Sequence, residues 1–301
     1  MVKKKVDNYY IKLKETINEN DFNEINDLKN TCAEHDNTQL KLEIEYKLSN
    51  SQKITKNVNA INEFMFYDDD KLVGYAGICD FGGDEIEVNG MVHPEYRRRG
   101  IFTRLFSLVK DEFNKRNSKA MLLLSDHNSA GGISFIKKIT DEYHHSEYDM
   151  NLDMDAIHRE SFNNLVFRKA VKEDVAKIAN ESFEFFYDID IDGILLDSTY
   201  VLEAGNALIG KVRLEIVEDT GGIYGLEVLP AYRGKGYGRE LLIRSINKLK
   251  ESKVNSINLQ VETENINALN LYKSCGFKEN YTMDYYILKK NDRLVGFFAC
   301  A

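Results

Sequence analysis

Apolar residues recur along this chain with two different periods. Helical spacing predicts an amphipathic helix with one face on a sheet, at Leu241, Leu242, Ile246 and Leu249. Runs rich in leucine and β-branched residues predict buried strands, at 120–125 and 256–261. Further apolar runs with polar turns between them predict pairs of strands, at 64–79 and 200–217. Strands that alternate with helices favour a mixed α/β sheet with helices on its faces.

The order of these elements occurs twice, because the sequence resembles itself at a distance of 136 residues. Pro94-Glu95-Tyr96-Arg97 corresponds to Pro230-Ala231-Tyr232-Arg233, and the distance from position 97 to position 233 is 136. The same distance relates Leu72-Val73-Gly74 to Leu208-Ile209-Gly210. A constant register over roughly 40 residues indicates a duplicated folding unit, with a period too long for a solenoid.

Two similar domains in series are therefore predicted, an N-terminal domain over residues 1–155 and a C-terminal domain over 164–301. The second domain is expected to begin with a short strand at Leu165 to Phe167. A helical stretch from Glu173 to Phe186 is expected to follow. The short apolar run at 295–301 has no role that the pattern explains.

Composition narrows the class of protein. With 43% apolar and 30% charged residues and only 2 prolines, the chain is expected to be ordered and globular. The net charge of −9 argues against general nucleic-acid binding, which needs a basic surface. No segment approaches the ~20 apolar residues that span a bilayer, and residues 1–10 lack the apolar stretch of a signal peptide. A cytoplasmic protein without a membrane partner is expected, and its oligomeric state stays open.

The cysteines give no sign of a metal or disulfide site. Cys32, Cys79, Cys275 and Cys300 are far apart and form no CxxC pair. This spacing predicts neither a disulfide framework nor zinc. We expect reduced, packed thiols and no metal cofactor.

The most informative segment connects an apolar strand to the second amphipathic helix, with the sequence Glu227-Val228-Leu229-Pro230-Ala231-Tyr232-Arg233-Gly234-Lys235-Gly236-Tyr237-Gly238. Its three glycines let backbone N–H groups approach an anion, and the N-terminus of the helix adds unpaired donors. Positive charge gathers there in an otherwise acidic chain, at Arg233, Lys235 and Arg239. The pattern favours a pyrophosphate site, although glycine-rich turns also precede helices that bind nothing.

The turn is not a P-loop, because no Gly-Lys-Ser/Thr follows at the required spacing, and it is not a dinucleotide fingerprint. Its Arg-x-x-Gly-x-Gly pattern, at Arg233, Gly236 and Gly238, resembles the acyl-CoA pyrophosphate loop of the GNAT superfamily. A second motif, Asn265-x-x-Ala268-x-x-Leu271-Tyr272 with Gly276-Phe277 after it, is similar to the helix beside the CoA thiol in that superfamily. The resemblance covers most of 165–288 and, through the repeat, roughly 64–152.

This resemblance implies two tandem GNAT-like acyl-CoA N-acyltransferase domains that use acetyl-CoA as a cosubstrate. It implies that Tyr272 gives a proton to the departing thiolate, and that Glu227 takes the amine proton through water. The backbone N–H of Leu229 would hold the thioester carbonyl, and Asn265 would bond the CoA arm. The implied CoA-binding residues are Leu229, Arg233, Gly234, Lys235, Gly236, Tyr237, Gly238, Arg239 and Asn265.

Both candidate catalytic side chains also have simpler interpretations. Tyr272 falls on one helical stripe with Ala268, Leu271 and Cys275, which is typical of a core aromatic residue. Glu227 would be an ordinary strand carboxylate if it were solvated, whereas burial between sheet faces would suit it to act as a base.

The N-terminal copy departs from the pattern at the positions that matter for catalysis. Four residues differ in kind, with Phe102 for Gly238, Met91 for Glu227, Ser129 for Asn265 and Ile136 for Tyr272. Arg97 to Gly100 could still hold a pyrophosphate, so CoA binding without catalysis stays open for this half. We favour a structural or acceptor-binding role for it and assign catalysis to the C-terminal half.

The function expected from the resemblance is N-acetyl transfer from acetyl-CoA by direct attack of a primary amine, in a small molecule, amino acid or peptide. Aromatic and acidic residues at 183–192 would suit a cationic acceptor, although a solvated acidic loop is the simpler interpretation. Two alternatives stay open, which are transfer of a different acyl group and a non-catalytic CoA-sensing or interaction protein.

Overall fold

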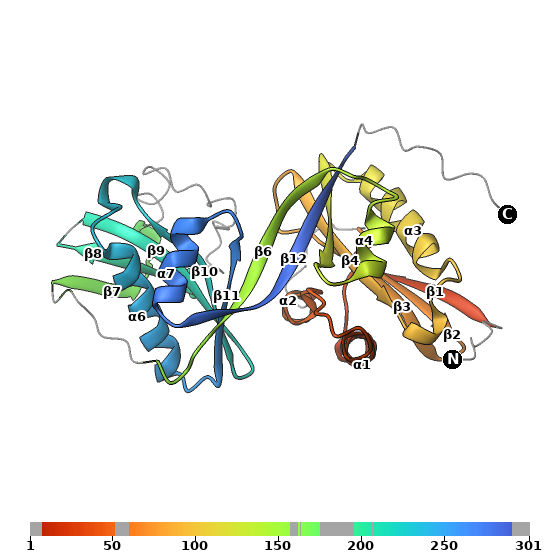
Figure 1. Cartoon of the computed structure of the whole chain (residues 1–301), viewed down its shortest axis with the longest axis horizontal. Helices are drawn as coiled ribbons and strands as arrows, with labels where there is room; N and C mark the ends of the chain where they lie inside the picture. The colour runs from red at the N-terminus through yellow and green to blue at the C-terminus, as the bar shows by residue number, and fades with distance from the viewer. Residues whose placement is uncertain are drawn as a thin grey trace. The chain divides into compact units, whose positions relative to one another are not determined.

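The computed structural model describes residues 8–51, 60–156, 162, 164–174, 196–205 and 207–290 (Figure 1). The chain forms two compact units. The first contains Met1–His145 and Met283–Ala301, and the second contains Ser146–Thr282. Both are mixed α/β structures, as the sequence predicts.

The first unit has a sheet with strand order β1-β2-β3-β4-β5-β12, in which only the β4–β5 pair is parallel. Its helices lie on both faces. Phe64 and Phe66 belong to the core under α3, whereas Met65 and Tyr67 belong to the core under α1, because successive strand residues face opposite sides. The elements are β1 (Tyr9–Lys14), α1 (Glu19–Asp36), α2 (Ile44–Ser51), β2 (Glu63–Asp68), β3 (Lys71–Cys79), β4 (Glu85–Val92), η1 (Pro94–Tyr96), α3 (Ile101–Lys115), β5 (Ala120–Asp126), α4 (Ala130–Ile136) and β12 (Phe277–Lys289).

The second unit repeats this arrangement with strand order β6-β11-β10-β9-β8-β7, in which the β10–β11 pair is parallel. The predicted amphipathic helix is α6, and its apolar face packs on the sheet in the main core of the unit. The elements are β6 (Tyr143–Leu152), β7 (Leu165–Lys169), β8 (Thr199–Ala204), β9 (Ala207–Val217), β10 (Thr220–Val228), η2 (Pro230–Tyr232), α6 (Tyr237–Glu251), β11 (Ser256–Glu262) and α7 (Ile266–Ser274).

The structure confirms the sequence repeat. Helices α3 and α6 begin and end at positions that are 136 residues apart, and so do strands β5 and β11. The turns before the two helices also share their backbone conformation. Gly100 and Gly236 have φ of +75° and +87°, and Arg98 has φ of +63° where Gly234 has +75°. Residue 98 therefore keeps a left-handed conformation that favours glycine although it is an arginine.

The last strand of each repeat pairs with a strand of the other repeat. Residues Met283 to Lys289 of β12 pair with β5, and residues Glu147 to Asn151 of β6 pair with β11. Each of the predicted domains, 1–155 and 164–301, thus includes a strand segment that lies in the other compact unit. Apolar alternation predicts that such a segment is a strand, but it does not specify the partner strand.

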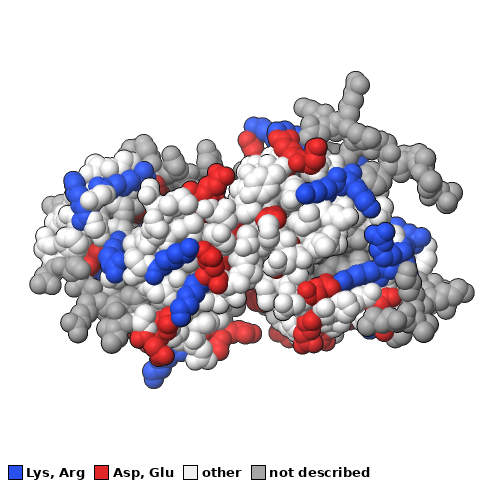
Figure 2. Space-filling view, viewed as in Figure 1, with Lys and Arg blue, Asp and Glu red and all other residues white. Residues whose placement is uncertain are grey.

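Some expectations concern segments beyond the described residues. Most of the predicted helix from Glu173 to Phe186, the aromatic and acidic stretch at 183–192, and the tail at 295–301 belong to this group. Strand β1 was not predicted. None of the described helices is both long and apolar enough to cross a membrane. Figure 2 shows basic and acidic side chains interspersed over the described part of the face drawn, without a continuous basic surface.

Candidate active site

The glycine-rich turn lies in the second unit between the end of β10 and the start of α6. Gly234 and Gly236 both have left-handed backbone conformations, with φ of +75° and +87°. A Cβ at Gly234 would meet no atom within 4 Å. Glycine is therefore favoured there by the left-handed backbone conformation and not by a lack of room for a side chain. Gly236 is the N-cap of α6 and supplies no side-chain cap. The first N–H groups of α6 are thus not capped by a side chain, as an anion site requires.

The three basic residues of the turn hold its shape through hydrogen bonds to protein oxygens. Nε of Arg233 donates to the Val228 carbonyl (2.8 Å), and Nζ of Lys235 donates to the Ala231 carbonyl (3.0 Å). Arg239 donates to Oγ and to the carbonyl of Ser274, at 2.6 and 3.2 Å. Arg239 therefore ties α6 to the end of α7, a contact that the sequence motif did not indicate.

Strands β10 and β11 separate next to this turn. Their parallel pairing stops at Ile223 and Leu259, whereas β10 continues to Val228 along β9 and β11 continues to Glu262 along β6. A β-bulge between Tyr224 and Glu227 interrupts β10 where the two strands part. The pairing of β4 with β3 in the first unit has no such bulge. Bulges commonly end pairing or redirect side chains beside active sites.

The N–H of Leu229, expected from the resemblance to hold the thioester carbonyl, is already used in the fold. It donates to the carbonyl of Ile209 on β9 at 2.9 Å. Peptide groups alternate in direction along a strand, so those of Val228 point away from β9 and toward the gap. The Val228 carbonyl accepts Nε of Arg233, which agrees with that direction. The candidate oxyanion donor is therefore the N–H of Val228 rather than that of Leu229.

Glu227 is a partly buried carboxylate, with a side chain only 13% exposed. One of its oxygens lies 3.8 Å from Nζ of Lys211, and the other lies 3.7 Å from Arg233. It pairs with Lys211 across the β10–β9 ladder, on the face opposite α6, because a Cβ at the adjacent Gly210 would contact Leu241 of α6. The burial disfavours the interpretation of Glu227 as a solvated strand residue.

Tyr272 is buried on α7, with 8% of its surface exposed, and its ring meets Phe277 edge to face at 6.0 Å. Burial raises the pKa of its phenol to about 12. The group therefore stays protonated at neutral pH, as a proton donor to a thiolate must. Tyr272 also belongs to the main core of this unit, so its packing role is real as well.

Asn265 has a structural role that the motif alone did not reveal. Its side-chain oxygen accepts the N–H of Ala268 at 3.1 Å and caps α7. Ser129 caps α4 in the same way in the first unit, where its hydroxyl accepts the N–H of Gly132 at 3.3 Å. The amide nitrogen of Asn265 keeps both of its hydrogens for other acceptors, and its oxygen keeps one lone pair.

The ends of three elements meet at Gly238, in the first turn of α6. A Cβ at this residue would lie 3.6 Å from Leu271 of α7 and 3.8 Å from Val228 of β10. Tyr272 follows Leu271 and Glu227 precedes Val228 in the chain. Leu271 and Val228, the chain neighbours of the candidate acid and the candidate base, therefore both lie against the first turn of α6.

The corresponding region of the first unit is a cavity of about 880 Å³ between β4, β5 and the starts of α3 and α4. Arg97 in its lining forms a two-pronged ion pair with Asp36, at 2.6 and 2.7 Å. Phe102 packs edge to face on Phe135 at 4.8 Å and lies against Gly90, where a Cβ would overlap its ring. Their counterparts in the second unit are Gly238 and Leu271, which carry no aromatic ring.

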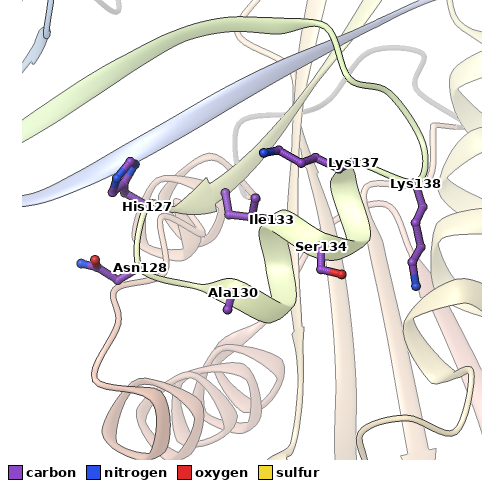
Figure 3. A pocket seen from close by; sticks show the side chains of 7 residues that line it. All are labelled: His127, Asn128, Ala130, Ile133, Ser134, Lys137 and Lys138. Carbon is purple, nitrogen blue, oxygen red and sulfur yellow. The ribbon is translucent and has the colours of Figure 1, made fainter.

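A second cavity of about 590 Å³ lies beside α4 (Figure 3). Its lining residues come from α4 and the loops at its two ends, and they are His127, Asn128, Ala130, Ile133, Ser134, Lys137 and Lys138. Nδ1 of His127 lies 2.9 Å from Asp284. Within the described part of the chain, no group of three or more His, Cys, Asp or Glu side chains is arranged to hold a metal ion.

Ionisation of Tyr272 predicts a change in stability at high pH. An unfolded tyrosine has a pKa of 10, so the unfolded state loses its proton first as the pH rises. The stabilisation from the buried neutral phenol is full below pH 10 and is lost between pH 10 and about 12. Tyr272→Phe should remove this loss. As the pH rises through this range, the free energy of unfolding of the variant should therefore decrease by about 2 kcal/mol less than that of the wild type. Urea unfolding of both proteins at pH 9 and pH 11.5 would measure it, and parallel losses would contradict it.

The similarity to known proteins agrees with this geometry. The model of the Acetyltransferase (GNAT) family matches residues 22–139 and again 166–277. The mycothiol acetyltransferase of Kineococcus radiotolerans is 24% identical over 246 residues, which are 74% of this chain and 80% of that protein. The [ribosomal protein bS18]-alanine N-acetyltransferase of Haemophilus influenzae is 35% identical over 82 residues, which are 27% of this chain and 56% of that protein.

Two solved structures share the fold across almost the whole chain. The GCN5-related N-acetyltransferase from Sphaerobacter thermophilus matches with a TM-score of 0.74 and 15% identity, over 93% of this chain and 95% of that one. A tandem GNAT protein from the clavulanic acid biosynthesis pathway matches with a TM-score of 0.67 and 13% identity, over 94% and 98%. The chain belongs to the acetyltransferase (GNAT) family, with the family domain present twice, and is an acyl-CoA-dependent N-acetyltransferase.

Proposed function

We propose that the second unit transfers the acetyl group of acetyl-CoA to a primary amine by direct attack, and that the first unit has a structural or acceptor-shaping role. Three features of elements that adjoin one another at Gly238 carry this proposal. These are the uncapped turn at Gly236, the buried carboxylate of Glu227 and the protonated phenol of Tyr272. Buried Met91 and Ile136 stand at the two catalytic positions in the first unit, and neither can exchange a proton.

Binding of the cosubstrate uses backbone groups more than side chains in this proposal. The pyrophosphate would accept hydrogen bonds from the N–H groups at the start of α6, from Gly236 to Arg239, with Arg233 and Lys235 adding positive charge. The extended arm of CoA would lie in the gap between β10 and β11, where strand peptide groups are not paired with each other. The amide nitrogen of Asn265 would donate to the same arm.

The transfer step assigns one task to each group. The amine nitrogen forms a bond to the thioester carbonyl carbon, and the carbonyl oxygen becomes an oxyanion that accepts the N–H of Val228. The carbon–sulfur bond then breaks, and the departing thiolate takes the phenolic proton of Tyr272. Glu227 takes the proton that the amine loses, through a water molecule, so the charges balance at the end of the step.

Replacement of Glu227 by glutamine tests this proposal. Glu227→Gln keeps the size of the side chain but removes the base, so kcat/KM for a primary amine should fall about 100-fold at pH 7. The loss should shrink at higher pH, because more of the amine is then neutral without help. Glu264→Gln, an exposed carboxylate next to α7, is the matched control and should keep full activity. An unchanged rate in Glu227→Gln would remove Glu227 from the mechanism.

A further inference from the structure

A platform of two cationic side chains, each beside a carboxylate, lies on the face of the sheet opposite α6. Lys211 and Arg213 are two positions apart on β9 and therefore share this face. They pair across the ladder with Glu227 and Tyr224 of β10, respectively. A Cβ at Gly221, next to this row on β10, would contact Leu249 of α6, so α6 covers the other face. Successive positions of a strand are about 3.3 Å apart, which puts Arg213 about 7 Å along β9 from Lys211.

The guanidinium of Arg213 is held by an aromatic ring and by an ion pair. It lies over the ring of Tyr224, 5.0 Å from the ring centre, and its Nε is 3.2 Å from a carboxylate oxygen of Glu215. The Tyr224 ring in turn lies on Gly222, where any Cβ would overlap it. Nε of Arg213 is buried and forms no hydrogen bond to the described residues. A stacked arginine with unused donors is well suited to bind a carboxylate.

The direction from which the acceptor must approach places it over this platform. Helices α6 and α7 pack together on one side of the β10–β11 gap, as the closeness of Gly238 to Leu271 indicates. The amine then reaches the thioester from the side of Glu227, and the rest of the acceptor extends along β9 and β10.

The platform is absent from the copy that lacks the catalytic residues. The positions of Lys211 and Arg213 are held by Tyr75 and Gly77 in the first repeat. Tyr75 is fully buried and donates to Glu63 at 2.5 Å, and Gly77 has no side chain. One lysine of α2, Lys47, reaches this place in the first unit and donates to Glu63 and Tyr75. The pair of cations on the strand itself is thus a feature of the second repeat.

We propose that Arg213, with Lys211, recognises a carboxylate on the amine acceptor. This inference rests on the proposed function and differs from the cationic acceptor that the stretch at 183–192 suggested. The carboxylate has two sources with the same chemistry, the main-chain carboxylate of a free amino acid and the side chain of an acidic residue near the N-terminus of a peptide.

Matched pairs of acceptors test the inference and separate these sources. Glycine against glycinamide tests a free amino acid, and Ala-Asp-Ala amide against Ala-Asn-Ala amide tests a peptide side chain. The acid member of at least one pair should have a kcat/KM about 10- to 100-fold higher, the range for hydrogen bonds to a charged group. Arg213→Gln should lower kcat/KM for that acid by the same factor and leave its amide partner unchanged.

Two further variants make the result specific. Arg213→Lys keeps the charge and should restore part of the preference for the acid. Lys248→Gln changes the net charge equally at an exposed position on α6 and should leave the preference intact. Equal use of both members of each pair, with intact turnover, would overturn the inference and leave the proposed function standing. No turnover of any acceptor, together with no acetyl-CoA binding in calorimetry, would overturn the proposed function itself.

Discussion

Tyr272→Phe is expected to lower kcat about 100-fold and to change the Kd for acetyl-CoA less than about twofold. The substitution removes only the phenolic hydroxyl, and the ring that packs on Phe277 remains. Ground-state binding of the cosubstrate should therefore persist, whereas the thiolate would leave without a proton. Single-turnover kinetics and calorimetric titration of the same preparation would separate the two quantities.

A second buried tyrosine provides the control for this prediction. Burial also raises the pKa of Tyr286, which packs in the core of the first unit. Tyr286→Phe removes a hydroxyl in the core of the first unit, to which the proposed function assigns no catalytic step, and should keep the wild-type kcat. Equal rates in all three proteins would reduce Tyr272 to its packing role.

Gly236→Arg is expected to weaken acetyl-CoA binding by at least about 100-fold, the effect of losing several charge-assisted hydrogen bonds. A side chain at this N-cap would cover the N–H groups at the start of α6. It would also strain a backbone with φ of +87° and approach Phe162, whose ring lies 3.6 Å from a Cβ at this position. Calorimetry should give one site per wild-type chain and no measurable site in the variant.

The repeat supplies a matched control for strain. Gly100→Arg places the same residue at the equivalent N-cap of α3, where φ is +75°. It should keep the single acetyl-CoA site, because the proposed function assigns that site to the second unit. Gly234→Ala adds a methyl group that meets no atom within 4 Å, so it tests the backbone conformation alone and should weaken binding only a few-fold. A site lost in Gly100→Arg but kept in Gly236→Arg would assign binding to the first unit.

Sequence reasoning predicted the parts of the structure that depend on local chemistry. The duplication and the helices after the two turns follow from residue types at fixed spacing, and the structure confirms them. Tyr272 and Glu227 lie at the ends of the elements on which they were predicted. Their proposed roles stay predictions until the variants are measured.

The parts that were missed depend on register and on contacts distant in sequence. The direction of a peptide group alternates at every residue, so the predicted donor at Leu229 and the proposed donor at Val228 point to opposite sides of the strand. The β-bulge beside Gly225 shifts the register there, and nothing in the apolar pattern marks it. The hydrogen bonds of Arg239 to Ser274 likewise join residues 35 positions apart, which a turn motif does not describe.

The pairing of β6 with β11 bears on how the two copies of the gene segment can evolve. A duplicated domain without an acid or a base is ordinarily free to decay or to be deleted. Here the first copy encodes the strand that completes the sheet of the second unit, and the second copy encodes the strand that pairs with β5. Loss of either copy would leave the other with an open sheet edge, which favours aggregation. Under the proposed function, selection on the second copy therefore also preserves the first, whatever the first copy binds.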